Sequence, residues 1–245
     1  QGRGGMIDFY YWPTPNGWKV SILLEECGID YRMIPLNISK GEQFSPDFLS
    51  ISPNNRMPGI VDDDPPPEYN GTPVKIFESG AILMHLARKT GKFMATDPVG
   101  EKETLEWLFW QVGNLGPMAG QISHFVNYAR GGHDYSKTRY ANEYNRCIGV
   151  LERRLTDREW LAGDAYSIAD IASWPWILIS KPLGQALDEF PNVARWRKAI
   201  KDRPAVQKGV DLGKDLRRSA PPTDEERELL YHQTAKSTAA MADRA

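Results

Sequence analysis

The hydrophobic pattern of the first part of the chain alternates between strand-like and helix-like spacing. Aromatic and β-branched residues dominate 6–11 and 31–36, which predicts two strands. Between them, the apolar residues of 16–27 recur with a helical period, and Gly28 is a typical helix end. The chain is therefore expected to open with a strand, a helix and a second strand.

A second group of elements follows closely. The segments 59–62 and 74–77 indicate a strand pair joined by a polar, proline-rich loop, and 79–90 indicates a helix. Apolar residues at helical spacing mark the side of this helix that should be buried: Ile82, Leu83, Leu86 and Ala87. The order βαβ and then ββα predicts a short mixed sheet with helices packed on it.

Beyond residue 98 the pattern is helical. Helices are predicted over 101–128, over 137–155, from Ser167 onward and over 191–203. Gly113 and Gly116-Pro117 interrupt the first of them, because a proline inside a helix removes a backbone donor. We expect a first domain over 6–91, an all-helical domain over 98–212 and a C-terminal extension over 213–245. The extension is expected to be partly helical or flexible, with Thr223 as a helix cap.

Composition and charge narrow the class of partners. The chain has 245 residues, of which 41% are hydrophobic, and a net charge of −2. These values allow a sizeable core and give no basic surplus for nucleic acid or an anionic membrane. No apolar run in the sequence reaches the roughly 20 residues that a membrane helix needs. We expect a cytoplasmic protein that binds neither nucleic acid nor membrane.

The cysteines also favour a reducing compartment. Cys27 and Cys147 are the only two in the sequence, which is no disulfide framework, and no residues have the spacing of a zinc site. Both cysteines lie in predicted helices, so buried structural thiols are the better interpretation. We therefore expect no bound metal.

Three short motifs carry candidate chemistry, and the first is the turn Thr14-Pro15-Asn16-Gly17. The start of the following helix presents unpaired N–H groups and a partial positive charge, which stabilise an anionic sulfur. The Thr14 hydroxyl and the Asn16 amide are further donors, and neither supplies a redox sulfur. Taken alone, both residues are more simply interpreted as turn and capping residues.

The other two motifs flank the predicted strand pair. Met57 precedes Pro58, and a cis peptide there would present a backbone edge to a peptide-like ligand, although these residues alone favour an ordinary turn. Ser79 is a natural helix cap next to Glu78, and together they suit the carboxylate and ammonium of an amino acid. The simpler interpretation is a capped helix and a surface acid. In this order, however, the three motifs match one γ-glutamyl-cysteinyl-glycine molecule.

These motifs make the sequence similar to the glutathione transferases. Within that family it most resembles the bacterial nu-class enzymes and the related fungal Ure2-like proteins. The resemblance is carried by the tracts 13–17, 51–55, 77–82, 107–113 and 116–118. It implies an α+β, thioredoxin-like βαβ-ββα domain that binds glutathione, followed by an all-α glutathione-transferase domain. Ser167-Ile-Ala-Asp170 resembles the helix-capping box of the latter.

The resemblance also assigns residues to glutathione, the implied co-substrate. Thr14 and Asn16 surround its sulfur as catalytic residues, and they stabilise the thiolate without acting as bases. The other implied contacts are Gln43 for the glycyl end, Met57 and Pro58 (at the family's cis-proline) for the cysteinyl unit, Glu78 and Ser79 for the γ-glutamyl end, and Arg139 from the helical domain. The protein itself is therefore expected to contribute no nucleophile.

The implied activity is glutathione-dependent disulfide reduction with modest conjugation of electrophiles. A small hydrophobic or disulfide substrate would bind between the domains, with Trp12, Trp110, His124, Phe125 and Tyr128 as candidate walls. Two alternatives remain open: a glutathione lyase acting on lignin-derived aromatic thioethers, and a non-catalytic glutathione-binding regulator. The resemblance further implies a homodimer, with the first domain of one subunit against the second domain of the other.

Overall fold

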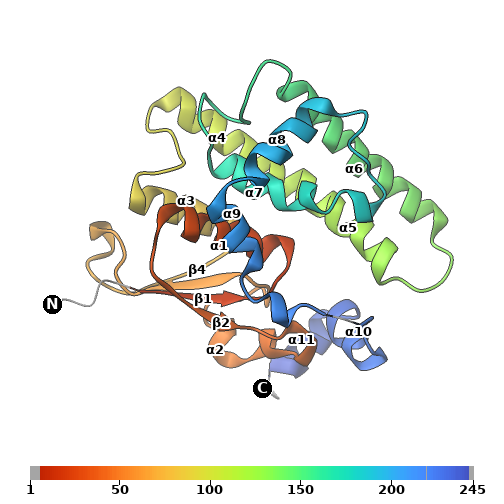
Figure 1. Ribbon diagram of the computed structural model, residues 1–245. Coiled ribbons are helices and arrows are strands. Elements are labelled where there is room, and N and C mark those ends of the chain that lie inside the picture. Colours follow the sequence, from red (N-terminus) through yellow and green to blue (C-terminus); the bar gives the residue numbers. More distant parts are fainter. Residues whose placement is uncertain (1–5, 219, 243–245) are drawn as a thin grey trace. The chain divides into compact units, whose positions relative to one another are not determined.

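The computed structural model describes residues 6–218 and 220–242, and the chain divides into two compact units (Figure 1). Unit 1 comprises residues 1–85 and 209–245, and unit 2 comprises residues 86–208. The C-terminal part of the chain thus groups with the first domain. From the sequence, we expected the helical domain to continue to 212 and a separate extension to follow it.

Unit 1 is built on a four-stranded mixed sheet with the strand order β2-β1-β3-β4. The strands are β1 (Ile7–Tyr11), β2 (Tyr31–Pro35), β3 (Gly59–Asp62) and β4 (Val74–Phe77). β1 is parallel to β2 and antiparallel to β3, and β3 is antiparallel to β4. The predicted mixed sheet is confirmed, with each strand at its expected place in the chain.

Helices pack on both faces of this sheet. α1 (Pro15–Cys27) and α3 (Ser79–Thr90) lie on one side, and the short α2 (Pro46–Leu49) lies on the other (Figure 1). On β1, the alternate residues Ile7, Phe9 and Tyr11 are completely buried, as expected when one face of a strand packs on a core. The four apolar residues predicted for the inner side of α3 are also buried.

The chain returns to unit 1 through three C-terminal helices, α9 (Pro204–Asp211), α10 (Asp224–Tyr231) and α11 (Ala235–Ala242). Two side chains of unit 1 hold this return. Ser21 Oγ in α1 donates to Gly209 O at 2.7 Å, and the Tyr11 hydroxyl in β1 donates to Leu212 O at 3.0 Å. The predicted cap at Thr223 is present at the start of α10.

Unit 2 is helical. Its elements are α4 (Pro98–Trp110), a π-helical segment (Gln111–Leu115), α5 (Gly116–Asn127), α6 (Asp134–Arg154), α7 (Ile168–Leu178) and α8 (Pro191–Lys201). The π segment contains Gly113 and ends just before Gly116-Pro117, where an interruption was predicted. The predicted capping box is confirmed: Ala169 N donates to Ser167 Oγ at 3.2 Å, and Ser167 N donates to Asp170 Oδ2 at 3.0 Å.

Three further observations concern the described residues. None of the helices in 6–218 and 220–242 combines the length and apolar character required to cross a membrane. The same residues form no group of three or more His, Cys, Asp or Glu side chains able to hold a metal ion. Cys27 and Cys147 are both buried thiols, as predicted.

Candidate functional site

The turn between β1 and α1 directs the Thr14 hydroxyl away from helix capping. Thr14 occupies the N-cap position, with φ −126° and ψ 162°, but its side chain makes no capping hydrogen bond. Instead, Thr14 Oγ1 donates to Met57 Sδ at 3.4 Å. The capping contact that residue type alone favours is therefore not made, and the hydroxyl faces a sulfur atom.

Gly17 lets the first turn of α1 come close to Met57. A Cβ atom on Gly17 would lie 2.4 Å from Trp12 O, 2.9 Å from Met57 Cε and 2.9 Å from Tyr11 Cε2. The carbonyl of Trp12 belongs to the backbone, so it cannot move aside as a flexible side chain can. Asn16 lies in the same first turn and is half-buried. Thr14, Asn16 and Met57 are thus gathered around one turn.

The Met57-Pro58 peptide bond is cis. The residues alone favoured an ordinary turn, and that expectation is wrong; the cis form implied by the family resemblance is confirmed. Just before it, Ser52 Oγ donates to Arg56 O at 2.8 Å and holds the loop. β3 begins directly afterwards at Gly59. Met57 therefore lies at the entry to the sheet, beside the first turn of α1.

The junction between β4 and α3 combines an acid with the start of a helix. Glu78 has a left-handed backbone with φ 68°, and α3 begins at Ser79. Ser79 is consequently the first helical residue and not the predicted cap, because the turn into the helix is made one residue earlier. Its hydroxyl remains next to the free N–H groups of the helix start. This arrangement retains the acid and the anion-attracting helix end expected from the sequence.

Lys19 of α1 belongs to the same junction, although it was not among the residues predicted from the sequence. It is only 2% exposed, and its Nζ lies 3.4 Å from Ser79 Oγ. Burial lowers the pKa of Lys19 to about 7, and the charge of Glu78 acts in the opposite direction. The available signal was a lysine inside the apolar run 18–24, since a buried charge needs a partner.

Gln43 presents a buried acceptor. It lies in a short 3-10 turn (Glu42–Phe44) and is 2% exposed. Its Nε2 donates to Ile38 O at 3.1 Å, whereas its Oε1 finds no hydrogen-bond partner in the part of the chain that the structure describes. A buried acceptor of this kind is costly unless a ligand or water satisfies it. An N–H donor, such as that of a peptide-like ligand, would satisfy this acceptor.

The C-terminal helices contact the segment that contains Gln43, and α11 packs against its 3-10 turn Glu42–Phe44. α10 packs against the 3-10 turn Ile38–Lys40, and a Cβ atom on Gly41 would lie 3.6 Å from Leu229. Arg218, which precedes α10, donates to Ser39 Oγ. Residues 38–44 are therefore held by the end of the chain.

Arg139, the contact predicted from the helical domain, lies on α6 in unit 2. Its Nη1 is 3.0 Å from Glu143 Oε1, and its side chain is 57% exposed. Arg146 pairs with the same carboxylate at 3.2 Å. These hydrogen bonds and charges, led by Arg146, lower the pKa of Glu143. Within unit 2, Arg139 is thus a surface residue in an ion-pair network.

Four of the predicted aromatic walls lie in unit 2, and three of them form one cluster. The ring of His124 contacts Phe125 and Tyr128, with centroids 5.6 and 6.3 Å apart. Phe125 also stacks on Tyr140 of α6, at 5.7 Å. Trp110 lies elsewhere on the chain and packs edge-on against its neighbour Trp107. The cluster at the end of α5 is a half-buried aromatic surface.

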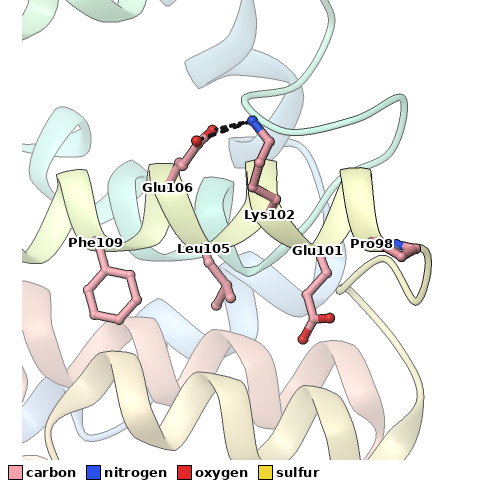
Figure 2. Close-up of a pocket in the computed structure, with 6 residues that line it drawn as sticks. All are labelled: Pro98, Glu101, Lys102, Leu105, Glu106 and Phe109. Carbon is pink, nitrogen blue, oxygen red and sulfur yellow. Dashed lines mark hydrogen bonds and ion pairs between the residues drawn. The ribbon is translucent and has the colours of Figure 1, made fainter.

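A shallow depression runs along α4. It is lined by Pro98, Glu101, Lys102, Leu105, Glu106 and Phe109. Figure 2 shows Leu105 and Phe109 on one side of the helix and the Lys102–Glu106 ion pair, 3.0 Å long, on the other. Phe109 is 62% exposed. None of the six lining residues was predicted to contact glutathione, so this depression is not the candidate site.

Known protein families match both parts of the chain. The glutathione S-transferase N-terminal domain matches residues 6–88, and the glutathione S-transferase C-terminal domain matches residues 133–204. The disulfide-bond oxidoreductase YfcG of Escherichia coli K12 is 48% identical over 201 residues, which cover 82% of this chain and 93% of that protein.

Solved structures give the same result. A glutathione transferase from Pseudomonas putida, with one glutathione disulfide bound per subunit, has a TM-score of 0.79 and 41% identity, covering 85% of this chain and 92% of that one. Ure2p in complex with S-hexylglutathione has a TM-score of 0.75 and 33% identity, covering 83% and 97%. The predicted fold, a thioredoxin-like domain followed by an all-helical domain, is confirmed.

Proposed function

Because the chain belongs to the glutathione S-transferase family and is similar to its YfcG-like and Ure2-like members, we propose that it reduces disulfide bonds with glutathione as co-substrate. The name of YfcG and the glutathione disulfide in the Pseudomonas structure support this proposal. The observation that carries the proposal is the position of the Thr14 hydroxyl. It makes no capping hydrogen bond to α1 and faces the sulfur of Met57.

In this proposal glutathione spans the three motifs of unit 1. Its γ-glutamyl end binds Glu78 and Ser79, and its cysteinyl unit binds the backbone of Met57 beside cis-Pro58. Its glycyl end contacts Gln43, whose Oε1 lacks a hydrogen-bond partner within the described residues. Arg139 is a weaker candidate contact, because its guanidinium already pairs with Glu143.

Thr14 and Asn16 would act on the sulfur as hydrogen-bond donors. The start of α1 adds its partial positive charge, and thiol pKa values fall at such positions. Neither side chain is a base at neutral pH, so the proton of glutathione leaves to solvent. The protein stabilises the thiolate of glutathione and supplies no nucleophile, in keeping with the burial of both cysteines.

The reaction then consists of two thiol–disulfide exchanges. The glutathione thiolate attacks one sulfur of the substrate disulfide, a mixed disulfide forms, and the other sulfur leaves as a thiolate. A second glutathione thiolate attacks the glutathione sulfur of the mixed disulfide and releases the second substrate thiolate. Two glutathione molecules are oxidised to glutathione disulfide, the substrate disulfide gains two electrons, and the protons lost by glutathione are taken up by the product thiolates.

A comparison of substrates tests this function. We expect turnover of a small dialkyl disulfide with glutathione to exceed turnover of a chloronitrobenzene, with glutathione disulfide formed in equal amount to the disulfide consumed. Glutathione binding without turnover of any disulfide or electrophile would instead indicate a non-catalytic regulator. The cytoplasm is the expected compartment, since the reaction consumes reduced glutathione.

The aromatic cluster of unit 2 favours one second candidate, a glutathione lyase. Stacked rings such as Phe125 and Tyr140 offer a surface for an aromatic thioether. In that reaction a glutathione thiolate would attack the glutathione sulfur of a glutathionyl aryl ketone, and the carbon–sulfur bond would break. The ketone would leave as an enolate that takes up the proton lost by glutathione, and glutathione disulfide would form. Turnover of the glutathionyl aryl ketone, with no turnover of a dialkyl disulfide, would favour the lyase over the disulfide reductase.

A further inference from the structure

Lys19 is the one buried lysine or arginine within residues 6–218 and 220–242, and it lies beside the proposed γ-glutamyl site. Its 2% exposure leaves the ammonium almost without solvation by water. A charge at such depth is strongly unfavourable unless polar or charged groups compensate it, and such groups often mark functional sites. Two groups that do so here, Ser79 and Glu78, are the residues predicted to hold the γ-glutamyl end.

The contact between Lys19 and Ser79 has a fixed direction when the lysine is charged. An ammonium has three N–H donors and no acceptor, so Ser79 Oγ accepts the hydrogen bond from Lys19 Nζ at 3.4 Å. The hydrogen of the Ser79 hydroxyl is then left for a different acceptor. Since Ser79 is the first residue of α3, a carboxylate drawn to the helix start is such an acceptor.

We propose that Lys19 is a positioning residue for the γ-glutamyl α-carboxylate of glutathione and acts through Ser79. Its ammonium orients the Ser79 hydroxyl as a donor and adds positive charge at a helix start that already favours an anion. Glu78 remains the acid for the ammonium of the ligand. This inference rests on the proposed function, because it takes glutathione as the ligand.

The burial of Lys19 further predicts that glutathione binding takes up a proton. Burial lowers the pKa of Lys19 to about 7, and Glu78, at the junction of β4 and α3, is the charged group that raises it. A bound carboxylate adds a second negative charge, so the pKa of Lys19 rises in the complex. At about pH 8 a largely neutral lysine therefore becomes charged when the ligand binds.

Calorimetric binding of S-methylglutathione tests this inference, because the blocked sulfur has no thiol to titrate. Titrations near pH 8 in two buffers of different ionisation enthalpy count the protons taken up. We expect wild type to take up a substantial fraction of a proton. Lys19→Met should take up much less and bind about tenfold more weakly. Lys19→Arg should retain most of the affinity without proton uptake, since arginine is always charged.

The outcomes separate this inference from the function it rests on. Lys19→Met is expected to fold, because replacing a buried charge by an apolar side chain is often neutral or stabilising, and thermal melting checks this. If folded Lys19→Met binds S-methylglutathione as tightly as wild type, or with the same proton uptake, the inference is overturned while the proposed function stands. If wild type itself binds no S-methylglutathione, both are overturned.

Discussion

The hydroxyl of Thr14 is available to a ligand because it makes no capping hydrogen bond to α1. A threonine at an N-cap normally accepts a hydrogen bond from an N–H group one turn into the helix. Here it donates to Met57 Sδ at 3.4 Å, and Gly17 permits the close approach that this contact requires. A side chain that donates to a sulfur in the free protein is well suited to donate to a thiolate.

Thr14→Val should therefore weaken stabilisation of the glutathione thiolate while keeping the shape of the side chain. Loss of one hydrogen bond to a charged group costs about 1.5–3 kcal/mol, which is roughly one to two pKa units. Ultraviolet titration of bound glutathione should show its thiol pKa raised by that amount, and disulfide turnover should fall about tenfold or more. Thr14→Ser is the matched control and should stay near wild type. An unchanged thiol pKa in Thr14→Val would remove Thr14 from the proposed site.

Lys19 also affects the pH dependence of folding. Its pKa is about 7 in the folded protein and returns to the ordinary value of 10.5 on unfolding. Between these values the unfolded chain binds the proton more tightly, so the folded state gains stability from this group as pH rises and loses it as pH falls towards about 7. Lys19→Met removes this dependence. Urea unfolding should show this as a difference in the free energy of unfolding, Lys19→Met minus wild type. The difference should be largest near about pH 7 and should become smaller towards about pH 10, as wild type gains stability. A constant difference would contradict the burial of a titrating lysine.

At the scale of elements, the strands and most helices could be predicted from the period of their apolar residues, which is clearest where one face is buried. β1 alternates buried and half-buried residues, and α3 carries four buried apolar residues at helical spacing. α11 was missed because it has no buried residue among those described, so its sequence has no apolar stripe to detect. Ser79 was misassigned as a cap because the left-handed backbone of Glu78 is not visible in the residue types.

The C-terminal helices should support the glycyl end of the glutathione site. A chain ending at Arg217 loses α10, α11 and the contacts of Arg218 and Leu229 with residues 38–44. Hydrogen–deuterium exchange of 38–44 should become faster, and glutathione should bind several-fold more weakly, a loss of about 1 kcal/mol. γ-Glutamylcysteine, which lacks the glycine, is the matched ligand and should bind equally well to both chains. Equal weakening for the two ligands would show a general disturbance of unit 1 instead.

At the scale of the whole molecule, the order of two domains followed from the change in hydrophobic period, whereas the return of the chain to unit 1 did not. That return depends on pairs far apart in sequence, such as Ser21 with Gly209 and Tyr11 with Leu212. The sequence around each of these four residues has no feature that indicates its distant partner. The Lys19–Ser79 contact was missed for the same reason, since it joins α1 and α3, which are separated in sequence by β2, β3 and β4.

The homodimer expected from the family resemblance needs an apolar surface, and α4 offers one. Phe109 is 62% exposed, and Leu105 lies beside it on the same side of the helix (Figure 2). Large apolar side chains gathered in this way mark interaction surfaces more often than isolated ones do. We predict that wild type is a dimer in light scattering coupled to size-exclusion chromatography, and that Phe109→Asp shifts it to monomer because a charge would be buried without a partner.

Tyr135→Asp, at an aromatic residue that is 84% exposed on α6, is the matched control and should remain dimeric. A dimeric Phe109→Asp would exclude this surface of α4 as the interface, and a monomeric wild type would contradict the homodimer itself.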